Sequence, residues 1–243
     1  MKTKIKGHQA ALLAGSIFIS SSIASHGATI ATFTGGDVGE GLALTNYNLE
    51  YAVNLGADQA DVTVQGVTFT SATSAGLTVG AVNLASNWGA VKNYGSSSND
   101  DNLEGIMRNA LLDWFGANPD SRTVAFNTGN TLTIGETYRL QMFFHEPSDG
   151  VANRFFDISV EGSLIVDDFN STQGDGLSAA QGYVVTYDFV AGDEALDILL
   201  TAGSTGNPDP FIQAFTLHVV PEPSSTALLG LGLSSLLLRR KRS

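Results

Sequence analysis

The sequence predicts an all-β protein, an antiparallel β-sandwich of the jelly-roll type with one short helix. Apolar and polar residues alternate in many short segments of the chain, which is the period-two pattern of strands with one buried face. Gly, Asn, Asp and Ser residues separate these segments, as the turns of an antiparallel sandwich require. The sequence contains no Cys, so its core and not disulfides must stabilise the domain.

Strands are expected wherever the alternation is continuous. It is clearest from Thr137 to His145, where every second residue from Tyr138 to Phe144 is apolar and is expected to face the core. Further strands are expected at Glu50–Leu55, Asp61–Thr70, Thr123–Phe126, Arg154–Glu161, Leu164–Asp167, Tyr183–Val190, Ala195–Thr201 and Phe211–Val219.

One segment has the period of a helix instead. Its apolar residues fall at positions i, i+3, i+4, i+7, i+8 and i+11, and they are Leu103, Ile106, Met107, Ala110, Leu111 and Trp114. The N-cap candidates are Asn99, Asp100 and Asp101, and Gly116 is expected to end the helix. Trp114 lies on the apolar stripe and is therefore expected in the core.

The first 27 residues have the pattern of a secretory signal peptide. Lys2, Lys4 and Lys6 precede an apolar run from Ala10 to Ile23, and small residues follow that run. Cleavage is expected after Ala24 or within a few residues of it. Residues 1–27 are therefore excluded from the fold, and the protein is expected to be exported.

The last 24 residues have three parts in a fixed order. A Pro-Glu-Pro segment comes first and is expected to be extended, because proline fixes φ and lacks an amide proton. An apolar run of 13 residues, Thr226 to Leu238, follows, and a cationic cluster ends the chain. As a helix this run reaches about 20 Å, short of the roughly 30 Å hydrocarbon core, so it can anchor a translocated chain only marginally.

This order resembles the PEP-CTERM sorting signal of Gram-negative bacteria. The residues that carry the resemblance are Pro221, Glu222, Pro223, Arg239, Arg240, Lys241 and Arg242. It implies export, processing by an exosortase-type membrane protease, transient anchoring by the C-terminal helix, and delivery to the cell surface or extracellular matrix. An ordinary single-pass tail anchor is the alternative. The chain then divides into a signal peptide at 1–27, a domain at 28–219 and a sorting signal at 220–243.

The domain between the two ends is strongly acidic. Five of the twelve Lys and Arg residues and 23 of the 24 acidic residues fall within it, a balance of −18. Nucleic acids and anionic membrane surfaces are polyanions, so both are excluded as partners. Neutral ligands or cations are favoured, although such a surface can also serve solubility alone.

Three stretches of the domain resemble the malectin-like carbohydrate-binding fold, a jelly roll. Tyr51–Gly56 with Val64–Phe69 resembles that family's first two strands, Tyr138–Val160 carries "YxLxxFFxE" and "RxFDIxVEG" patterns, and Asn207–Phe211 resembles its Asn-Pro turn. The helical segment near Leu103–Trp114 departs from the family, since it replaces a region of aromatic contacts. The resemblance implies a non-catalytic domain that binds carbohydrate at one edge.

Sugar recognition needs an aromatic ring against the sugar and polar groups for its hydroxyls, all on loops at one edge of a rigid scaffold. Tyr47, Trp88 and Tyr94 lie in loop-like contexts that would expose a ring. Glu146 and Asp209 match positions near the family's binding edge and can accept hydroxyl hydrogens. The alternative for Trp88 and Tyr94 is that both rings pack down on the rim of the sheet.

The sequence shows no HExxH, GxSxG or Gly-rich phosphate motif. Acids are so abundant that no pair stands out as the two carboxylates of a glycoside hydrolase. Three acid-rich loops, Asn99–Asp101, Asp167–Asn170 and Gly192–Glu194, offer oxygen ligands, so a structural calcium ion is a further expectation and no other cofactor is expected.

The sequence is therefore interpreted as an exported, non-enzymatic sandwich that binds extracellular polysaccharide at the cell surface or in a biofilm matrix. The alternative is a structural or adhesive matrix protein without a small ligand. A binder should present Trp88, Tyr94 and a carboxylate around one concave edge, whereas a structural protein should bury the rings.

Overall fold

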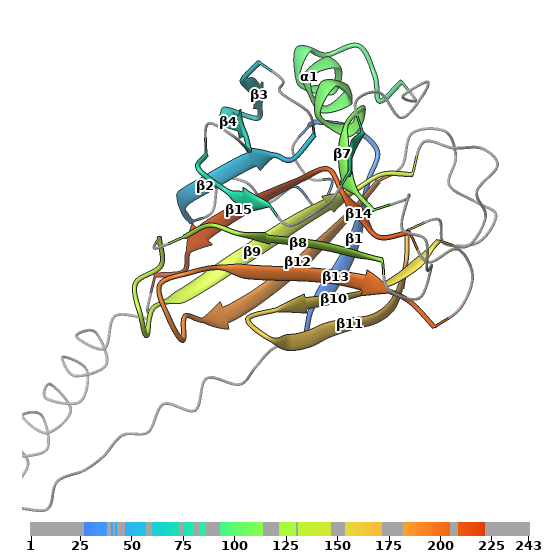
Figure 1. Cartoon of the computed structure of the whole chain (residues 1–243). Coiled ribbons are helices and arrows are strands. Elements are labelled where there is room, and N and C mark those ends of the chain that lie inside the picture. Colours follow the sequence, from blue (N-terminus) through green and yellow to red (C-terminus); the bar gives the residue numbers. More distant parts are fainter. Residues whose placement is uncertain are drawn as a thin grey trace, which may run out of the picture.

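The computed structural model describes residues 27–37, 40, 42, 47–56, 60–72, 75–79, 83–85, 93–113, 122–129, 131–146, 154–171, 182–204 and 209–221. These residues form three β-sheets and one short helix, α1 (Ser98–Met107) (Figure 1). The predicted all-β class with one short helix is confirmed. The predicted signal helix and C-terminal hydrophobic helix lie outside the described residues, within which no helix is long and apolar enough to cross a membrane.

The largest sheet has seven strands in the order β1-β12-β9-β15-β2-β4-β3. Its strands are β1 (Thr29–Phe33), β2 (Asn48–Asn54), β3 (Val62–Val64), β4 (Val67–Ser71), β9 (Thr137–Phe144), β12 (Gly182–Val190) and β15 (Ala214–Val219). Neighbouring strands are antiparallel except β2 and β4, which are parallel. The segment with the clearest alternation, β9, therefore lies well inside this sheet.

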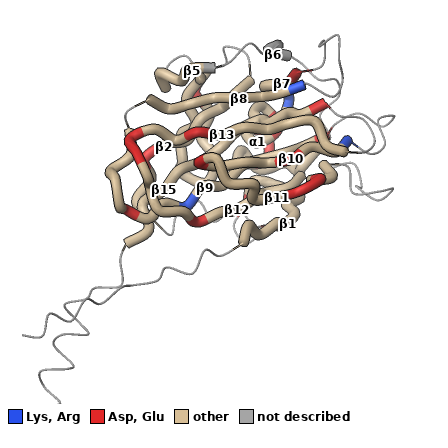
Figure 2. The backbone as a smooth tube through the Cα atoms, turned by 60° about the horizontal axis from the view of Figure 1, so that its bottom comes forward, with Lys and Arg blue, Asp and Glu red and all other residues tan. Residues whose placement is uncertain are grey.

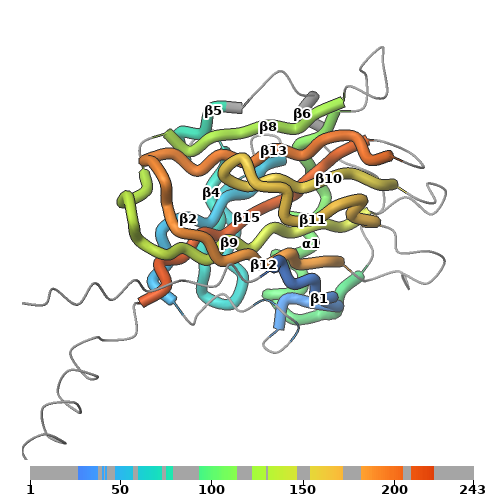
Figure 3. Tube along the Cα trace, turned by 90° about the horizontal axis from the view of Figure 1, so that it is seen from below, coloured from blue at the N-terminus to red at the C-terminus, as the bar shows by residue number. Residues whose placement is uncertain are grey.

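A second sheet has five strands in the order β11-β10-β13-β8-β5, and a third has three in the order β14-β7-β6. Their strands are β5 (Thr78–Val79), β6 (Asn83–Ala85), β7 (Ala110–Leu112), β8 (Thr123–Asn127), β10 (Phe155–Val160), β11 (Ser163–Asn170), β13 (Asp197–Ala202) and β14 (Phe211–Ile212). The five-stranded sheet covers one face of the seven-stranded sheet (Figure 3).

The main core lies between these two sheets. Its centre is a group of fully buried phenylalanine rings, Phe144, Phe156, Phe169 and Phe211, which come from strands of all three sheets. The ring centroids of Phe144 and Phe169 are 4.9 Å apart, and those of Phe156 and Phe211 are 5.5 Å apart. Each such ring stabilises the fold by about 3–5 kcal/mol, judged by the usual cost of truncation to Ala.

A second core lies on the other face of the seven-stranded sheet. Leu103, Ile106 and Met107 of α1 pack there with Phe33 and Phe143, and all five side chains are buried. The helix therefore forms a third layer over part of the sheet. This layer explains the helical period, because only one stripe of α1 faces apolar neighbours.

The bounds of the helix differ from the prediction. Its N-cap is Ser97, whose Oγ accepts a hydrogen bond from the Asp100 backbone N–H at 3.1 Å, while the Ser97 N–H donates to the Asp100 carboxylate at 3.1 Å. The helix ends at Met107, and Ala110 and Leu111 belong to β7 instead, because pairing with β6 and β14 overrides the local period. Trp114 and Gly116 lie outside the described residues.

Two predicted strands are each split in the structure. Residues 61–70 form the hairpin β3–β4, whose turn residues Gln65 and Gly66 have φ of 51° and 77°, the signature of a tight two-residue turn. The last segment divides at Gln213 into β14 and β15. Strands β1, β5, β6 and β7 were not predicted, because they are short or lack alternation.

Candidate functional site

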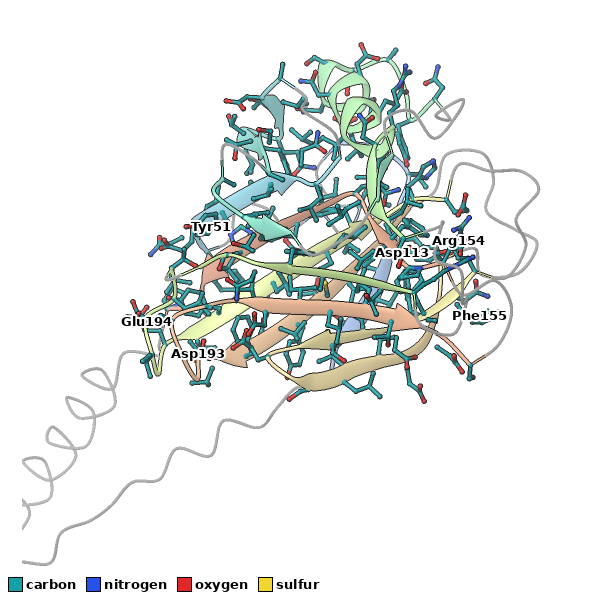
Figure 4. The ribbon with its side chains drawn as sticks, viewed as in Figure 1. Tyr51, Asp113, Arg154, Phe155, Asp193 and Glu194 are labelled. Carbon is teal, nitrogen blue, oxygen red and sulfur yellow. The ribbon has the colours of Figure 1, made fainter. Side chains whose placement is uncertain are left out.

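Four charged residues meet at one end of the sandwich, which we call the loop end. Glu146 follows β9 by two residues, Arg154 directly precedes β10, Asp209 precedes β14 by two residues, and Arg122 directly precedes β8. Arg154 is labelled in Figure 4 at this end of the ribbon. The topology thus brings together two of the predicted site residues, Glu146 and Asp209, through Arg154.

Arg154 is the centre of this ion network. Its Nε lies 2.8 Å from Glu146 Oε2, and its Nη1 lies 3.2 Å from Asp209 Oδ2. The same Nη1 also donates to the Asp209 backbone oxygen at 3.4 Å, and Arg122 forms an ion pair with the other Asp209 oxygen. Two cations and two anions therefore neutralise one another at the loop end.

The network is almost completely shielded from solvent. The side chains of Arg154, Glu146 and Asp209 are 4%, 1% and 7% exposed. Burial lowers the pKa of the Arg154 guanidinium, and the neighbouring Glu146 carboxylate counteracts this shift. The guanidinium also lies over the Phe211 ring, 5.6 Å from its centroid. A buried charge set of this kind is costly to break, since each partner has lost its hydration.

Tyr94 reaches the same region from the other side of the sheet. Its ring is buried in the second core, so the packed-down alternative holds for Tyr94 and the exposed ring does not. Its hydroxyl lies 2.8 Å from Nδ1 of His145, the residue next to Glu146, and burial with the Glu104 charge raises the pKa of Tyr94 well above its ordinary value. Tyr94 therefore supports the strand end that carries Glu146. A ligand cannot stack on this ring without rearrangement.

Gln213 fixes the same strand end. Its side-chain Oε1 accepts the His145 backbone N–H at 3.0 Å, and its Nε2 donates to the His145 carbonyl at 2.5 Å. Its own backbone N–H donates to Phe143 O at 3.1 Å. Gln213, which lies between β14 and β15, thus continues the hydrogen-bond pattern of the sheet by one position, with its side-chain amide in place of a backbone amide.

Tyr47 lies far from the loop end. The Arg139 guanidinium packs over its ring, 4.6 Å from the centroid, and forms a double hydrogen bond with Asp188, each at 2.7 Å. Because Arg139 and His145 are six residues apart on one extended segment, the two places are separated by about 20 Å. The structure does not bring Tyr47 together with Glu146 and Asp209.

Several predicted site residues lie outside the described residues. These are Trp88 and the sorting residues Glu222, Pro223, Arg239, Arg240, Lys241 and Arg242. Pro221 is described and exposed. The prediction for Trp88 therefore stays a prediction.

Sequence reasoning missed Arg122 and Arg154. A signal for them exists in the composition, because a domain with 23 acids has only five cations, and two of these precede strands. Red segments dominate over blue ones along the backbone in Figure 2. An arginine buried in such a chain is expected to hold specific carboxylates.

The acid-rich segment Asp167–Asn170, which was predicted to be a loop, belongs to β11 instead, and it contributes to a carboxylate cluster on the five-stranded sheet. Asp157, Asp167 and Asp168 each place a carboxylate oxygen within 4.8 Å of the others. Asp168 accepts hydrogen bonds from the N–H and hydroxyl of Ser204, and Asp157 accepts from the Asp168 N–H. The cluster is therefore tied together by the chain itself.

Comparison with known proteins gives a match for the C-terminal segment and, separately, for the fold of the core. The family model of the PEP-CTERM protein-sorting motif matches residues 219–242. No curated protein sequence matches the chain.

The fold is similar to ectodomains of plant receptor kinases. The ANX1 ectodomain from Arabidopsis thaliana superposes with a TM-score of 0.54 at 14% identity over 72% of this chain, and the ANX2 ectodomain from the same plant with 0.55 at 14% over 72%. The plant receptor-like kinase FER gives 0.53 at 13% over 72%. This chain spans 49%, 50% and 43% of those three chains, about half their length. The chain thus combines a core whose fold is similar to that of these receptor ectodomains with a C-terminal segment that matches the PEP-CTERM protein-sorting motif.

Proposed function

We propose that this protein is exported, sorted through its PEP-CTERM motif, and binds carbohydrate without catalysis at the loop end of its sandwich. The observation that carries the proposal is the buried ion network of Arg122, Glu146, Arg154 and Asp209. Residues 1–27 act as the signal peptide, 28–219 as a malectin-like jelly roll, and 220–243 as the sorting signal, whose hydrophobic helix anchors the chain until an exosortase processes it. The protein then resides at the cell surface or outside the cell.

The network supports binding because it supplies a rigid polar base beneath the loops. Glu146 and Asp209 are buried, so they act as positioning residues and do not themselves bond sugar hydroxyls. Arg154 links the end of β9, the start of β10 and the segment that leads into β14. Binding loops need a base of this kind, since their own contacts are few.

The same network argues against a glycoside hydrolase. Such an enzyme needs one protonated carboxyl group as general acid and a second carboxylate across a cleft. Glu146 and Asp209 instead form ion pairs with one guanidinium. Both carboxylates are thus directed at the same guanidinium, an arrangement that differs from a general acid and a second carboxylate on opposite sides of a cleft.

A glycan-array screen of the exported, processed protein tests the proposal, and it is run with and without calcium because the cluster of Asp157, Asp167 and Asp168 offers carboxylate oxygens to a cation. We expect an oligosaccharide to bind and Trp88→Ala to weaken binding about ten-fold, the usual loss for an aromatic ring at the centre of an interface. Tyr47→Ala is the matched control, because Tyr47 lies at the other end of the sandwich and should leave binding unchanged.

Two results would contradict the proposal. Loss of binding with Tyr47→Ala would place the site near Tyr47 and Arg139, away from the ion network. Absence of binding by a folded protein would favour the alternative, a structural or adhesive matrix protein whose sandwich has no small ligand.

A further inference from the structure

The sorting motif begins inside the folded domain. The matched residues start at Val219, which is the last residue of β15 and pairs with Tyr138 on β9 and Asn48 on β2. The next residue, Val220, donates its N–H to the Thr137 oxygen at 2.9 Å, and Pro221 is exposed. No spacer therefore separates the last hydrogen bond of the sheet from Pro-Glu-Pro.

Exposed apolar side chains surround this exit. Leu49, Ile134 and Val190 are 41%, 61% and 39% exposed, and they make up half of the large exposed apolar residues found in the described segments. Leu49 on β2 is the partner of His218 on β15, Val190 on β12 is the partner of Thr137 on β9, and Ile134 lies in the turn before β9. We call these three residues the exit rim. Single exposed apolar residues are ordinary, but a group around one point marks a contact surface.

Acidic residues lie beside the exit rim. Glu136, Asp193 and Glu194 are exposed, and the turns that carry them are joined by backbone hydrogen bonds, including Ala191 N–H to Glu136 O at 3.0 Å. A groove of about 610 Å³ lined by Val190 and Asp193 opens next to them. Figure 4 labels Asp193 and Glu194 close together at one end of the sandwich. Anionic lipid headgroups repel such a surface, so a protein partner fits it better than a bilayer.

We propose that the exit rim is a contact surface for the membrane protease that processes the sorting motif. A protease that grips Pro-Glu-Pro holds several residues in an extended form, at about 3.3 Å each, and so must approach the folded domain within a few residues of Val220. The three apolar side chains then pack against the protease while the acids face its polar or basic groups. The proposal depends on the sorting motif and is independent of the proposed carbohydrate site.

The test measures processing of the full chain in cells that contain the protease, as the rate at which the precursor is converted to the shortened form in a pulse-chase experiment. We expect Ile134→Ser with Val190→Ser to slow conversion about ten-fold, which corresponds to about 1.4 kcal/mol of contact free energy. Leu164→Ser with Leu199→Ser is the matched control, since these residues are 57% and 40% exposed on the five-stranded sheet. A flexible insert of about six Gly and Ser residues between Val220 and Pro221, about 20 Å when extended, should slow conversion likewise, because it separates rim and motif.

Three outcomes would overturn the proposal. Normal processing of the rim variant or of the insert variant would show that the protease needs only the tail. Equal slowing by the rim and control pairs would point to general destabilisation. If the rim variant instead abolished binding of the processed protein to vesicles of phosphatidylglycerol and phosphatidylethanolamine, the exit rim would be a membrane contact.

Discussion

The two ends of the sandwich use charge in opposite ways. At the loop end, Arg154 is buried between Glu146 and Asp209, and its side chain is 4% exposed. Toward the exit end, Arg139 pairs with Asp188 in good geometry but is 25% exposed. The same strand, β9, connects both places. One end therefore holds a desolvated network, and the other holds an ordinary surface ion pair with exposed apolar residues nearby.

This difference in burial indicates that the loop end, more than the exit end, needs a rigid arrangement of its strand ends. Buried ion networks rarely stabilise a protein more than apolar packing would, so their presence needs another reason. At the loop end that reason is the fixing of strand ends from three sheets relative to one another. At the exit end short hydrogen-bonded turns suffice, as between Glu136 and Ala191.

The largest expected effect comes from replacing the central arginine. Arg154→Met should lower the free energy of unfolding by about 3–5 kcal/mol, because Glu146 and Asp209 stay buried without their shared guanidinium. Arg139→Met should lower it by no more than about 1 kcal/mol, because solvent screens that pair. Urea denaturation of both variants measures the two values.

Equal losses for Arg154→Met and Arg139→Met would break the comparison between the ends. The comparison would also fail if Arg154→Met were as stable as the unchanged protein, because the network would then tolerate an apolar side chain at its centre. The slope of the denaturation curve serves as control, because it should not change if both variants unfold from the same compact state.

A smaller effect is expected at the N-terminus of α1, in the layer that supports Tyr94. Asp100 is buried, and hydrogen bonds from the Gly36 N–H and from Ser97 lower its pKa. An acid whose folded pKa is depressed stabilises the protein above its unfolded pKa, near pH 4, and this stability is lost as the pH falls through the folded value. Asp100→Asn should cost about 1 kcal/mol at pH 7 and reduce the loss of stability on acidification.

Asp101→Asn is the matched control for that prediction, because Asp101 is the next residue of the same helical turn and is exposed. Unfolding followed from pH 7 to about pH 3 distinguishes the variants. A parallel pH profile for Asp100→Asn and the unchanged protein would show that the capping carboxylate does not act as described.

Strands whose position depends on a local pattern of apolar residues were predictable from the sequence. The alternation in 137–145 and 154–161 located β9 and β10 almost to the residue, because both strands are buried on one face along their whole length. The same logic failed at Ala110 and Leu111, where an apolar period continued past the end of α1. Pairing with distant strands decided that segment, and no local pattern contains this information.

The candidate site was predictable only in part for a similar reason. Glu146 and Asp209 were identified through their places in family-like motifs, but their meeting at Arg154 depends on the register of three sheets. The burial of Tyr94 likewise depends on α1, which begins four positions later at Ser98, and on His145, which is 51 positions away in the sequence. Loop-like composition indicates a loop and does not indicate whether another layer covers it.

The smallest expected effect lies at the exit end, in the turn between β10 and β11. Glu161 has φ of 52°, accepts the Asp197 N–H at 2.8 Å, and has a raised pKa because of burial and the nearby Asp193 and Asp197 charges. An acid whose folded pKa is raised destabilises the protein once both states are ionised, so stability falls as the pH rises through the interval between the two pKa values. Glu161→Gln keeps the acceptor oxygen and removes the charge. It should therefore raise the free energy of unfolding at pH 7 by roughly a few tenths of a kcal/mol. At pH 7 this change in stability is opposite in sign to that of Asp100→Asn, and it should vanish near pH 4. An increase in stability that persists at low pH would mean that the charge of Glu161 is not the cause.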